Sequence, residues 1–136
     1  MKKRMDPSQL DGVTLAYIGD CVMELFVRRL LVESGLAGSA ELNRAAQQIV
    51  NAAAQAQSFR RIEALLTEEE IVYYRRGRNS GHLNLPKHAK MSDYRTATGF
   101  EALLGYLSLN GENKRVEELL AACIEIPQLR SLKANG

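Results

Sequence analysis

Apolar side chains recur along the chain with the spacing of an α-helix. Leu15, Ile18 and Val22 lie three or four residues apart, and the same spacing continues to Phe26. Residues at such intervals fall on one face of a helix. No proline lies between residues 8 and 85 to interrupt a helix, and the strict alternation of apolar and polar residues that marks a β-strand is missing there. The pattern predicts an all-α fold.

Capping and helix-ending residues divide this pattern into six predicted helices. Thr67 followed by Glu70 is typical of a capping box, in which each side chain accepts a hydrogen bond from the other residue's backbone N–H. Ser39 is a further predicted N-cap, and we expect Gly77 and Gly111 to follow the ends of two helices. The expected helices cover residues 8 or 11 to 34, 39–50, 51–66, 67–76, 92–110 and 112–126.

Length and composition predict one domain of a protein that is not embedded in a membrane. The 136 residues suit a single domain, 1–136, in which we expect 1–7 and 128–136 to be flexible ends. A content of 46% hydrophobic and 25% charged residues excludes general disorder. No run of about 20 apolar residues could span a bilayer, and the basic N-terminus lacks the apolar stretch of an export signal. We therefore expect a cytoplasmic protein.

Two acidic residues lie in segments that otherwise have the pattern of buried helices. Asp20 lies in the stretch LAYIGDCVMELF and Glu101 in TGFEALLGYL. A buried carboxylate without a partner is costly. Each acid has a glycine nearby, Gly19 and Gly105, although a glycine within a helix costs about 1 kcal/mol relative to alanine. We expect the two helices to cross at these glycines and to bring Asp20 and Glu101 together.

Two carboxylates that meet repel each other unless a proton or a cation lies between them. One solution is an arginine partner, for which Arg28, Arg29 and Arg95 are candidates. The other is a hard divalent cation such as Mg²⁺, which prefers carboxylate and water oxygens. The spacing alone is compatible with both interpretations.

The segment from residue 71 to 95 is strongly basic, although the whole chain is nearly neutral. The chain has a formal net charge of +2, whereas this segment has six basic residues and one acidic residue, for a net charge of +5. The basic residues are Arg75, Arg76, Arg78, Lys87, Lys90 and Arg95. Such side chains bind phosphate oxygens, and carboxylates that hold Mg²⁺ commonly act on phosphates. The combination favours phosphodiester chemistry on a nucleic acid, although a charged segment can also be a solvated surface.

Two motifs resemble the ribonuclease III catalytic-domain family. Residues 17–25, YIGDCVMEL, resemble the signature helix of that family, F-L-G-D-A-V-L-E-L. Residues 100–105, FEALLG, resemble its second motif, F-E-A-L-I-G. The compact length and the RRGRN segment resemble the short bacterial branch of the family, Mini-ribonuclease III, which lacks a double-stranded-RNA-binding domain.

The resemblance implies an all-helical homodimer that cuts double-stranded RNA with Mg²⁺, for which Mn²⁺ can substitute. By position, Asp20 matches the family's catalytic aspartate and Glu101 its metal-binding glutamate, so both are expected to be catalytic residues and metal ligands. Attack by water on the phosphodiester would leave 5′-phosphate and 3′-hydroxyl ends. The branch is associated with maturation of large-subunit ribosomal RNA, and a precursor of that RNA is the expected partner.

Part of the family's acidic cluster is missing from this chain. Ala16 and Val13 replace acids before the catalytic aspartate, and Thr98 replaces an aspartate before the second-motif glutamate. We expect the Thr98 hydroxyl to hydrogen-bond a water held by the metal. A-form RNA presents phosphates and 2′-hydroxyls across a wide minor groove. The residues expected to contact them are Arg75, Arg76, Arg78, Asn79, Lys87 and Lys90.

Other interpretations of the same residues are possible. A non-catalytic helical module that binds double-stranded RNA or associates with the ribosome would need the basic segment but not both acids. A helical scaffold would use the acids only as ion-pair partners. For Glu24, one turn after Asp20, an i,i+4 ion pair with Arg28 is at least as well supported by the spacing as a part in catalysis, so Glu24 is not assigned to the site. His82 and His88 are too isolated to be assigned as ligands.

Overall fold

The protein is all-α, as the sequence pattern predicts. The computed structural model describes residues 5–80 and 90–124, and within these ranges it contains six α-helices, two short 3₁₀ turns and no strand. The helices are α1 (Gly12–Glu33), α2 (Ser39–Val50), α3 (Ala52–Ile62), α4 (Glu68–Arg78), α5 (Met91–Leu109) and α6 (Asn113–Cys123). None of the described helices combines the length and the hydropathy that a membrane span needs.

Parts of several predictions fall on residues that the structure does not describe. The predicted flexible ends lie outside the described residues at 1–4 and 128–136, while Pro7 begins the first 3₁₀ turn, Pro7–Gln9. The final residues of the sixth predicted helix, 125–126, also lie outside. The same holds for Lys87, His82 and His88.

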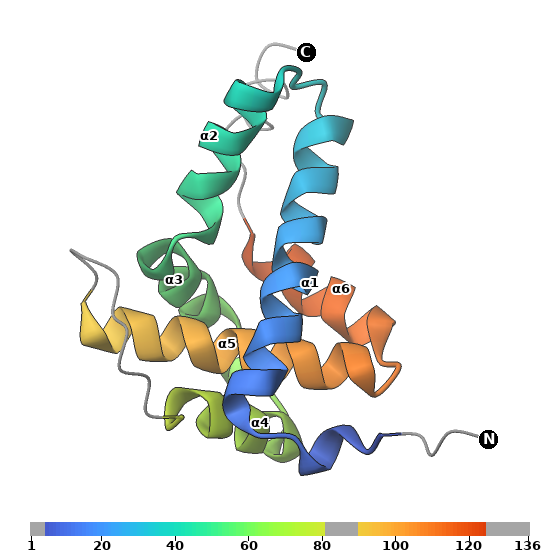
Figure 1. Cartoon of the computed structure of the whole chain (residues 1–136), viewed down its shortest axis with the longest axis vertical. Helices are drawn as coiled ribbons and strands as arrows, with labels where there is room; N and C mark the ends of the chain where they lie inside the picture. Colours follow the sequence, from blue (N-terminus) through green and yellow to red (C-terminus); the bar gives the residue numbers. More distant parts are fainter. Residues whose placement is uncertain (1–4, 81–89, 125–136) are drawn as a thin grey trace.

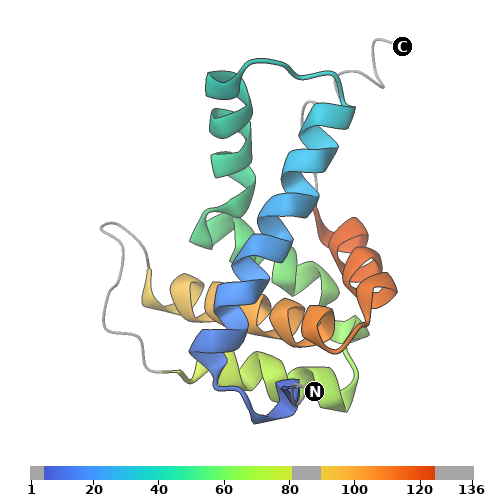
Figure 2. The same ribbon diagram turned by 45° about the vertical axis from the view of Figure 1, so that its right-hand side comes forward.

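Helix α5 lies at the centre of the molecule. It crosses α1 and packs against α3, α4 and α6 (Figure 1). The second half of α1 lies beside α2, and the two project from the layer formed by α4 and α5, as both ribbon views show (Figure 1, Figure 2). Elements from both halves of the sequence therefore meet on the central helix.

The central position of α5 follows from its sequence. Between residues 97 and 107 every side of α5 is buried, and only Glu101 is partly exposed. A helix that is apolar all round is stable only when other elements cover all of its faces. The Phe59 ring of α3 covers one face, with its centroid 5.6 Å from that of Phe100. Phe59 also stacks on Tyr74 of α4, at a centroid distance of 4.1 Å, so one aromatic cluster joins three helices.

Capping residues explain where several helices begin. The predicted capping box is confirmed, because the backbone N–H of Thr67 donates to the Glu70 carboxylate at 2.9 Å and the backbone N–H of Glu70 donates to the Thr67 hydroxyl at 3.1 Å. Asn51 is the N-cap of α3. The predicted cap Ser39 is instead the first residue of α2, whose N-cap is Gly38.

The predicted crossing of two helices at glycines is confirmed. A Cβ atom at Gly19 of α1 would collide with the backbone carbonyl of Glu101 on α5. A Cβ atom at Gly105 of α5 would collide with the backbone carbonyl of Leu15 on α1. Each helix therefore presents a glycine where the backbone of the other comes closest, and α1 and α5 approach more closely than any larger residues would allow.

The predicted end of α4 before Gly77 is wrong. The helix continues through Gly77 to Arg78. A Cβ atom at Gly77 would collide with the Ala102 side chain and would lie 2.7 Å from the carbonyl oxygen of Thr98 and 2.9 Å from the Cα atom of Gly99. Gly77 is thus required for the close packing of α4 on α5, and it does not end the helix.

Candidate active site

The crossing of α1 and α5 brings the carboxyl groups of Asp20 and Glu101 together. Asp20 follows Gly19, which lies directly against the Glu101 backbone. The two carboxyl groups are close enough to share a hydrogen bond when one is protonated. Burial, together with the negative charge of Asp20, raises the pKa of Glu101 to about 8. Asp20 forms the exposed side of this pair and Glu101 the more buried side.

Helix α3 supplies a third polar group to the acidic pair. The Gln55 side chain is only 4% exposed, and its Nε2 group donates to Oε2 of Glu101 at 3.4 Å and to the backbone oxygen of Val50 at 2.8 Å. Gln55 is not among the residues predicted from the sequence to act at the site. Its position contains a signal, since Gln55 precedes the buried residues Phe59 and Ile62 by four and seven residues and so shares their helix face.

The arginines considered as partners for the two acids do not pair with them. Arg28 lies 2.7 Å from Glu24, which is the i,i+4 ion pair that the spacing supports. Arg29 lies 3.8 Å from Glu33. In the described part of the chain, neither acid of the pair forms an ion pair with Arg28, Arg29 or Arg95. The charge of the acidic pair is therefore not balanced by a described arginine.

The acidic pair fits a hydrated divalent cation. Carboxylate oxygens are hard ligands that suit Mg²⁺ and Mn²⁺, and Mg²⁺ usually keeps several of its waters in protein sites. The described residues contain no group of three or more His, Cys, Asp and Glu side chains that could hold a metal ion. Asp20 and Glu101 would therefore be the carboxylate ligands, and water would complete the coordination. Exposed Asp20 leaves this position open to solvent.

Thr98, the other residue predicted to act near the metal, makes its hydrogen bond within its own helix. Thr98 is buried, and its hydroxyl donates to the backbone oxygen of Tyr94 in the preceding turn at 2.9 Å. That bond uses the hydroxyl proton and leaves the oxygen available only as an acceptor. Ala16 is buried and Val13 is exposed. The expected contact of Thr98 with a metal-held water stays a prediction.

The predicted RNA-binding arginines of α4 differ in how many contacts their side chains make within the protein. Arg75 is exposed. The Arg76 guanidinium donates to the backbone oxygens of Ser8 at 2.7 Å and Leu10 at 2.9 Å, so it anchors the segment before α1. Arg78 lies over the Tyr74 ring, with its guanidinium carbon 5.6 Å from the centroid.

The remaining predicted contacts flank the undescribed segment. Asn79 is the C-cap of α4 and its Oδ1 accepts from the Nε group of Arg78 at 3.3 Å. Lys90 is exposed and is the N-cap of α5. Lys87 lies outside the described residues.

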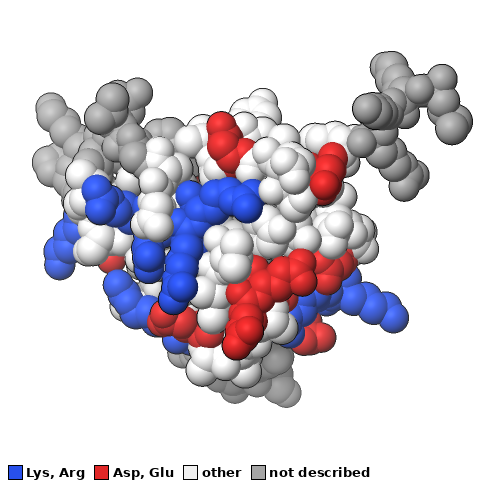
Figure 3. All heavy atoms as spheres, turned by 90° about the horizontal axis from the view of Figure 1, so that it is seen from below, with Lys and Arg blue, Asp and Glu red and all other residues white. Residues whose placement is uncertain are grey.

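Charges are unevenly distributed over the face that carries α4. The first turn of α4 is acidic and its last turn is basic. Figure 3 shows this face, on which a group of Lys and Arg side chains lies beside a separate group of Asp and Glu side chains. The residues at the two ends of α4 are Glu68, Glu69 and Glu70, and Arg75, Arg76 and Arg78. Along α4, a polyanion would be attracted to the basic end and repelled by the acidic end.

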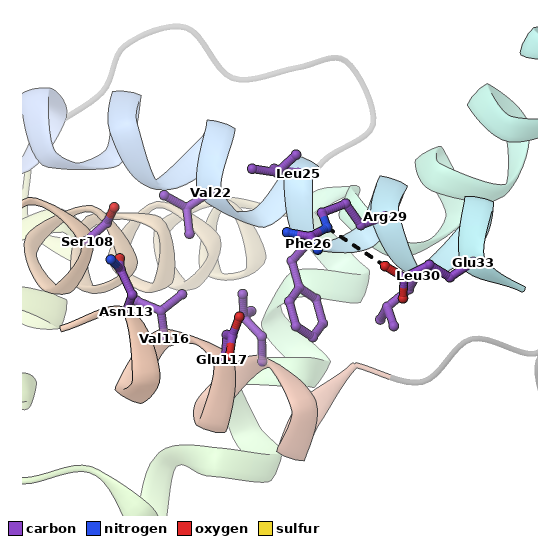
Figure 4. Close-up of a pocket in the computed structure, with 11 residues that line it drawn as sticks. Val22, Leu25, Phe26, Arg29, Leu30, Glu33, Ser108, Asn113, Val116 and Glu117 are labelled. Carbon is purple, nitrogen blue, oxygen red and sulfur yellow. Dashed lines mark ion pairs between the residues drawn. The ribbon is translucent and has the colours of Figure 1, made fainter. Parts of the chain in front are cut away.

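A hollow of about 330 Å³ lies between α1 and α6 and is separate from the acidic pair. Val22 and Phe26 of α1 and Val116 of α6 point into it, and the ion pair of Arg29 with Glu33 lies at its edge (Figure 4). Its lining contains none of the residues predicted to act in catalysis or RNA binding. We assign no chemistry to this hollow.

Comparisons with known proteins found a family match, related sequences and a similar solved structure. The Ribonuclease III domain profile matches residues 13–112. A Mini-ribonuclease 3 of Enterococcus faecalis is 44% identical over 122 residues, which cover 88% of this chain and 92% of the relative. A Mini-ribonuclease 3 of Symbiobacterium thermophilum is 42% identical over 120 residues, again covering 88% and 92%. The crystal structure of protein FN1578 from Fusobacterium nucleatum matches with a TM-score of 0.78 and 27% identity, covering 85% of this chain and 93% of that one. The chain therefore belongs to the ribonuclease III family, in its Mini-ribonuclease III branch.

Proposed function

We propose that this protein is a metal-dependent endoribonuclease that cuts double-stranded RNA. The observation that carries the proposal is the convergence of Asp20 and Glu101 at the crossing of α1 and α5, with no arginine paired to either acid in the described structure. Membership of the ribonuclease III family supports the substrate class. The acidic pair is proposed as the catalytic and metal-binding centre.

The reaction is hydrolysis of a phosphodiester bond. Water attacks the phosphorus, the bond to the 3′ oxygen breaks, and the products carry 5′-phosphate and 3′-hydroxyl ends. Asp20 and Glu101 would hold Mg²⁺ or Mn²⁺ at the helix crossing. When bound there, the cation would supply a water of lowered pKa and a positive charge that stabilises the phosphate oxygens. The backbones of the two acids lie at the close approach of α1 and α5, where a Cβ atom at Gly19 would collide with the Glu101 carbonyl, and a packed scaffold of this kind holds side chains in place.

RNA recognition is assigned to the basic end of α4 and to the start of α5. Arg75 and Lys90 are exposed and free to reach phosphates, whereas Arg76 holds the segment before α1 in place. Backbone contacts of this kind carry little sequence information and weaken as salt concentration rises. A precursor of large-subunit ribosomal RNA in the cytoplasm is the proposed natural substrate, since the short branch is associated with its maturation.

A homodimer is proposed from an exposed apolar stripe on α1. Tyr17 is 75% exposed and Leu25 is 60% exposed, and Val13 and Val32 are further exposed apolar residues of the same helix. Large apolar side chains that gather on one face commonly mark an interface. Asp20 lies next to this stripe in sequence, so a two-fold pairing would place two active sites near the interface. Each site would then cut one strand of the duplex.

Digestion of long duplex RNA tests the proposed function. In Mg²⁺, the wild type should produce 5′-phosphate ends, while Asp20→Asn and Glu101→Gln should cut on the order of 100-fold more slowly or not at all, since each loses a metal ligand. Glu41→Gln is the matched control, because Glu41 is exposed in the first turn of α2, away from the helix crossing.

The digestion also separates the proposal from its alternative. Intact RNA after incubation with wild type across a range of metal, salt and pH would contradict the endonuclease. Retained binding of duplex RNA under those conditions would then favour a non-catalytic RNA-binding module.

A further inference from the structure

Gln55 is a buried polar side chain for which the proposed hydrolysis gives no role. It is 4% exposed and lies on α3, whereas the two acids come from α1 and α5. Its Nε2 group is the donor of the hydrogen bond that the structure describes to the Glu101 carboxylate, at 3.4 Å. A third helix therefore reaches the acidic pair through this side chain.

The geometry of α3 fixes the Gln55 amide. Asn51 adopts extended backbone angles, φ −67° and ψ 160°, and separates α2 from α3. The carbonyl of Val50 at the end of α2 accepts a hydrogen bond from Gln55 Nε2 at 2.8 Å. One amide nitrogen thus binds a carbonyl whose position is set by the helix junction and, at the same time, the carboxylate of Glu101. This shared nitrogen links the orientation of Glu101 to the α2–α3 junction.

The oxygen of the same amide has no partner. Oε1 of Gln55 is buried without a hydrogen bond, the one such side-chain atom among the described residues. An unsatisfied buried acceptor costs about 1–3 kcal/mol. The oxygen is bonded to the same carbon as the nitrogen that reaches Glu101, so both atoms belong to one amide group next to the Glu101 carboxylate. A water that has other polar partners would satisfy this acceptor.

We propose that Gln55 is the positioning residue of the metal site, whose amide nitrogen orients Glu101 toward Asp20 and whose amide oxygen accepts a hydrogen bond from a water of the bound cation. The inference rests on the proposed function, because it needs a cation at the acidic pair. Groups that hold metal ligands and metal-bound waters commonly change affinity or activity by about 10- to 100-fold when removed. In a site with two carboxylates, such a neutral group contributes orientation without adding charge.

A purely structural role makes a different prediction. If Gln55 only joined α2 to α3 through the Val50 carbonyl, its loss would lower the melting temperature and leave the metal affinity of the folded protein unchanged. A positioning role requires that metal affinity and the rate of cleavage change in the protein that remains folded.

Titration of the full chain with Mn²⁺ distinguishes the two roles. Binding is monitored as the loss of the electron-paramagnetic-resonance signal of unbound Mn²⁺. Gln55→Met retains the length of the side chain and removes both polar atoms. It should raise the Mn²⁺ dissociation constant about 10-fold or more and lower kcat for duplex RNA with little change in KM. Gln48→Met is the matched control, because Gln48 is exposed on α2, and it should bind Mn²⁺ as the wild type does. Unchanged Mn²⁺ affinity in folded Gln55→Met would overturn the inference.

A measurement on the wild type keeps the inference testable if Gln55→Met does not fold. In an ¹⁵N-labelled chain, the Gln55 side-chain amide signals are identified as those that move in the shorter variant Gln55→Asn. Mg²⁺ should shift these signals, while the side-chain amide signals of Gln48, which is exposed on α2, should shift little. Gln55 signals that do not respond to Mg²⁺, in a protein that binds Mn²⁺ through Asp20, would show that the amide does not contact the hydration shell.

Failure of the inference differs from failure of the proposed function. Wild-type protein that binds Mn²⁺ and cuts RNA, together with a Gln55→Met variant that does both equally well, overturns only the role of Gln55. Wild-type protein whose Mn²⁺ binding equals that of Asp20→Asn overturns the metal site itself, and the role of Gln55 with it.

Discussion

The carboxyl group of Glu101 would serve the proposed metal site, but its ionisation destabilises the metal-free fold. Its carboxyl group is largely buried and faces a second carboxyl group, so ionisation is opposed by burial and by charge repulsion. Gln55 is the described donor that favours the ionised form, at 3.4 Å. A cation at the pair would remove the repulsion. In the metal-free protein, the proton takes that place over a wide range of pH.

The stability of the protein in EDTA should depend on pH through Glu101. Glu101 has a pKa of about 8 in the folded protein and near 4.5 when unperturbed. Between these values the folded protein holds a proton that the unfolded chain has lost, so the free energy of unfolding should fall as pH rises. Urea denaturation at pH 4.5 and 8.5 should show that Glu101→Gln exceeds the wild type by about 1–3 kcal/mol at the higher pH only.

The same variant should not gain stability from Mg²⁺, because it lacks one of the two ligands. Parallel stability curves for wild type and Glu101→Gln across this pH range would contradict the environment described for Glu101. Glu41→Gln again serves as the control, and its curve should follow that of the wild type.

The N-terminal ends of α4 and α6 are joined by hydrogen bonds of the Arg115 side chain. The Arg115 guanidinium donates to Glu70 at 2.7 and 2.8 Å and to the backbone oxygen of Leu65 at 2.9 Å. Glu70 also completes the capping box at the start of α4. The hydrogen bonds from Arg115 lower the pKa of Glu70, against the opposing effect of burial. One carboxylate therefore begins α4 and attaches it to α6.

Glu70→Gln tests this connection between elements. At pH 7 it should lower the free energy of unfolding by about 1–3 kcal/mol, since Arg115 loses a buried charged acceptor. A carboxylate whose pKa is depressed on folding stabilises the protein above its unfolded pKa and loses that effect as pH falls. The difference from wild type, followed by urea denaturation, should shrink as pH falls below about 4.5.

Glu118→Gln is the matched control for Glu70→Gln. Glu118 pairs with the same arginine, but its side chain is 67% exposed. Removing an exposed ion pair should change stability by no more than about 1 kcal/mol. Equal losses in the two variants would show that the buried position of Glu70 has no special contribution.

Local signals allowed most helices to be predicted, whereas close packing between helices was harder to infer. The capping box at Thr67 depends on neighbours in sequence and was predicted correctly. Gly77 was expected to end α4 because glycine often follows helices. Glycine is needed at this position because α5 lies so close that Thr98 and Ala102 leave no room for a side chain. A helix-ending glycine and a packing glycine look alike until the partner helix is known.

The acidic pair was predictable because charge and glycine occur together in two otherwise apolar segments. Asp20 and Glu101 each conflict with their apolar surroundings, and such a conflict commonly marks a functional position. Gln55 was missed because an amide within an alanine-rich segment carries no charge to attract attention. Its partners, Val50 and Glu101, become evident only when three helices are placed together.

At the scale of the whole molecule, α1 is buried on one side and carries exposed apolar residues on the other. Leu15, Met23 and Val27 are buried in the core, whereas Tyr17 and Leu25 are exposed. A small domain that leaves such residues in water gains by covering them with a second copy. This asymmetry is the structural support for the proposed homodimer.

Tyr17→Glu should weaken that dimer, because it places a charge within the apolar stripe. Sedimentation at micromolar concentration should show the wild type near twice 15.1 kDa and the variant shifted toward 15.1 kDa. Val72→Glu is the matched control, since Val72 is 51% exposed on α4, outside the stripe. A wild type that sediments as a single chain would contradict the dimer.

The contact of Gly19 with the Glu101 backbone has a consequence for how activity can be gained and lost. The residues that let two distant segments come together are immediate neighbours of the residues that would perform hydrolysis. Any partly open state in which α1 lifts from α5 separates the acids and leaves each on a solvated helix. If these acids perform the hydrolysis, cutting is confined to the fully folded molecule, and a proteolytic fragment that holds either motif alone would be inert.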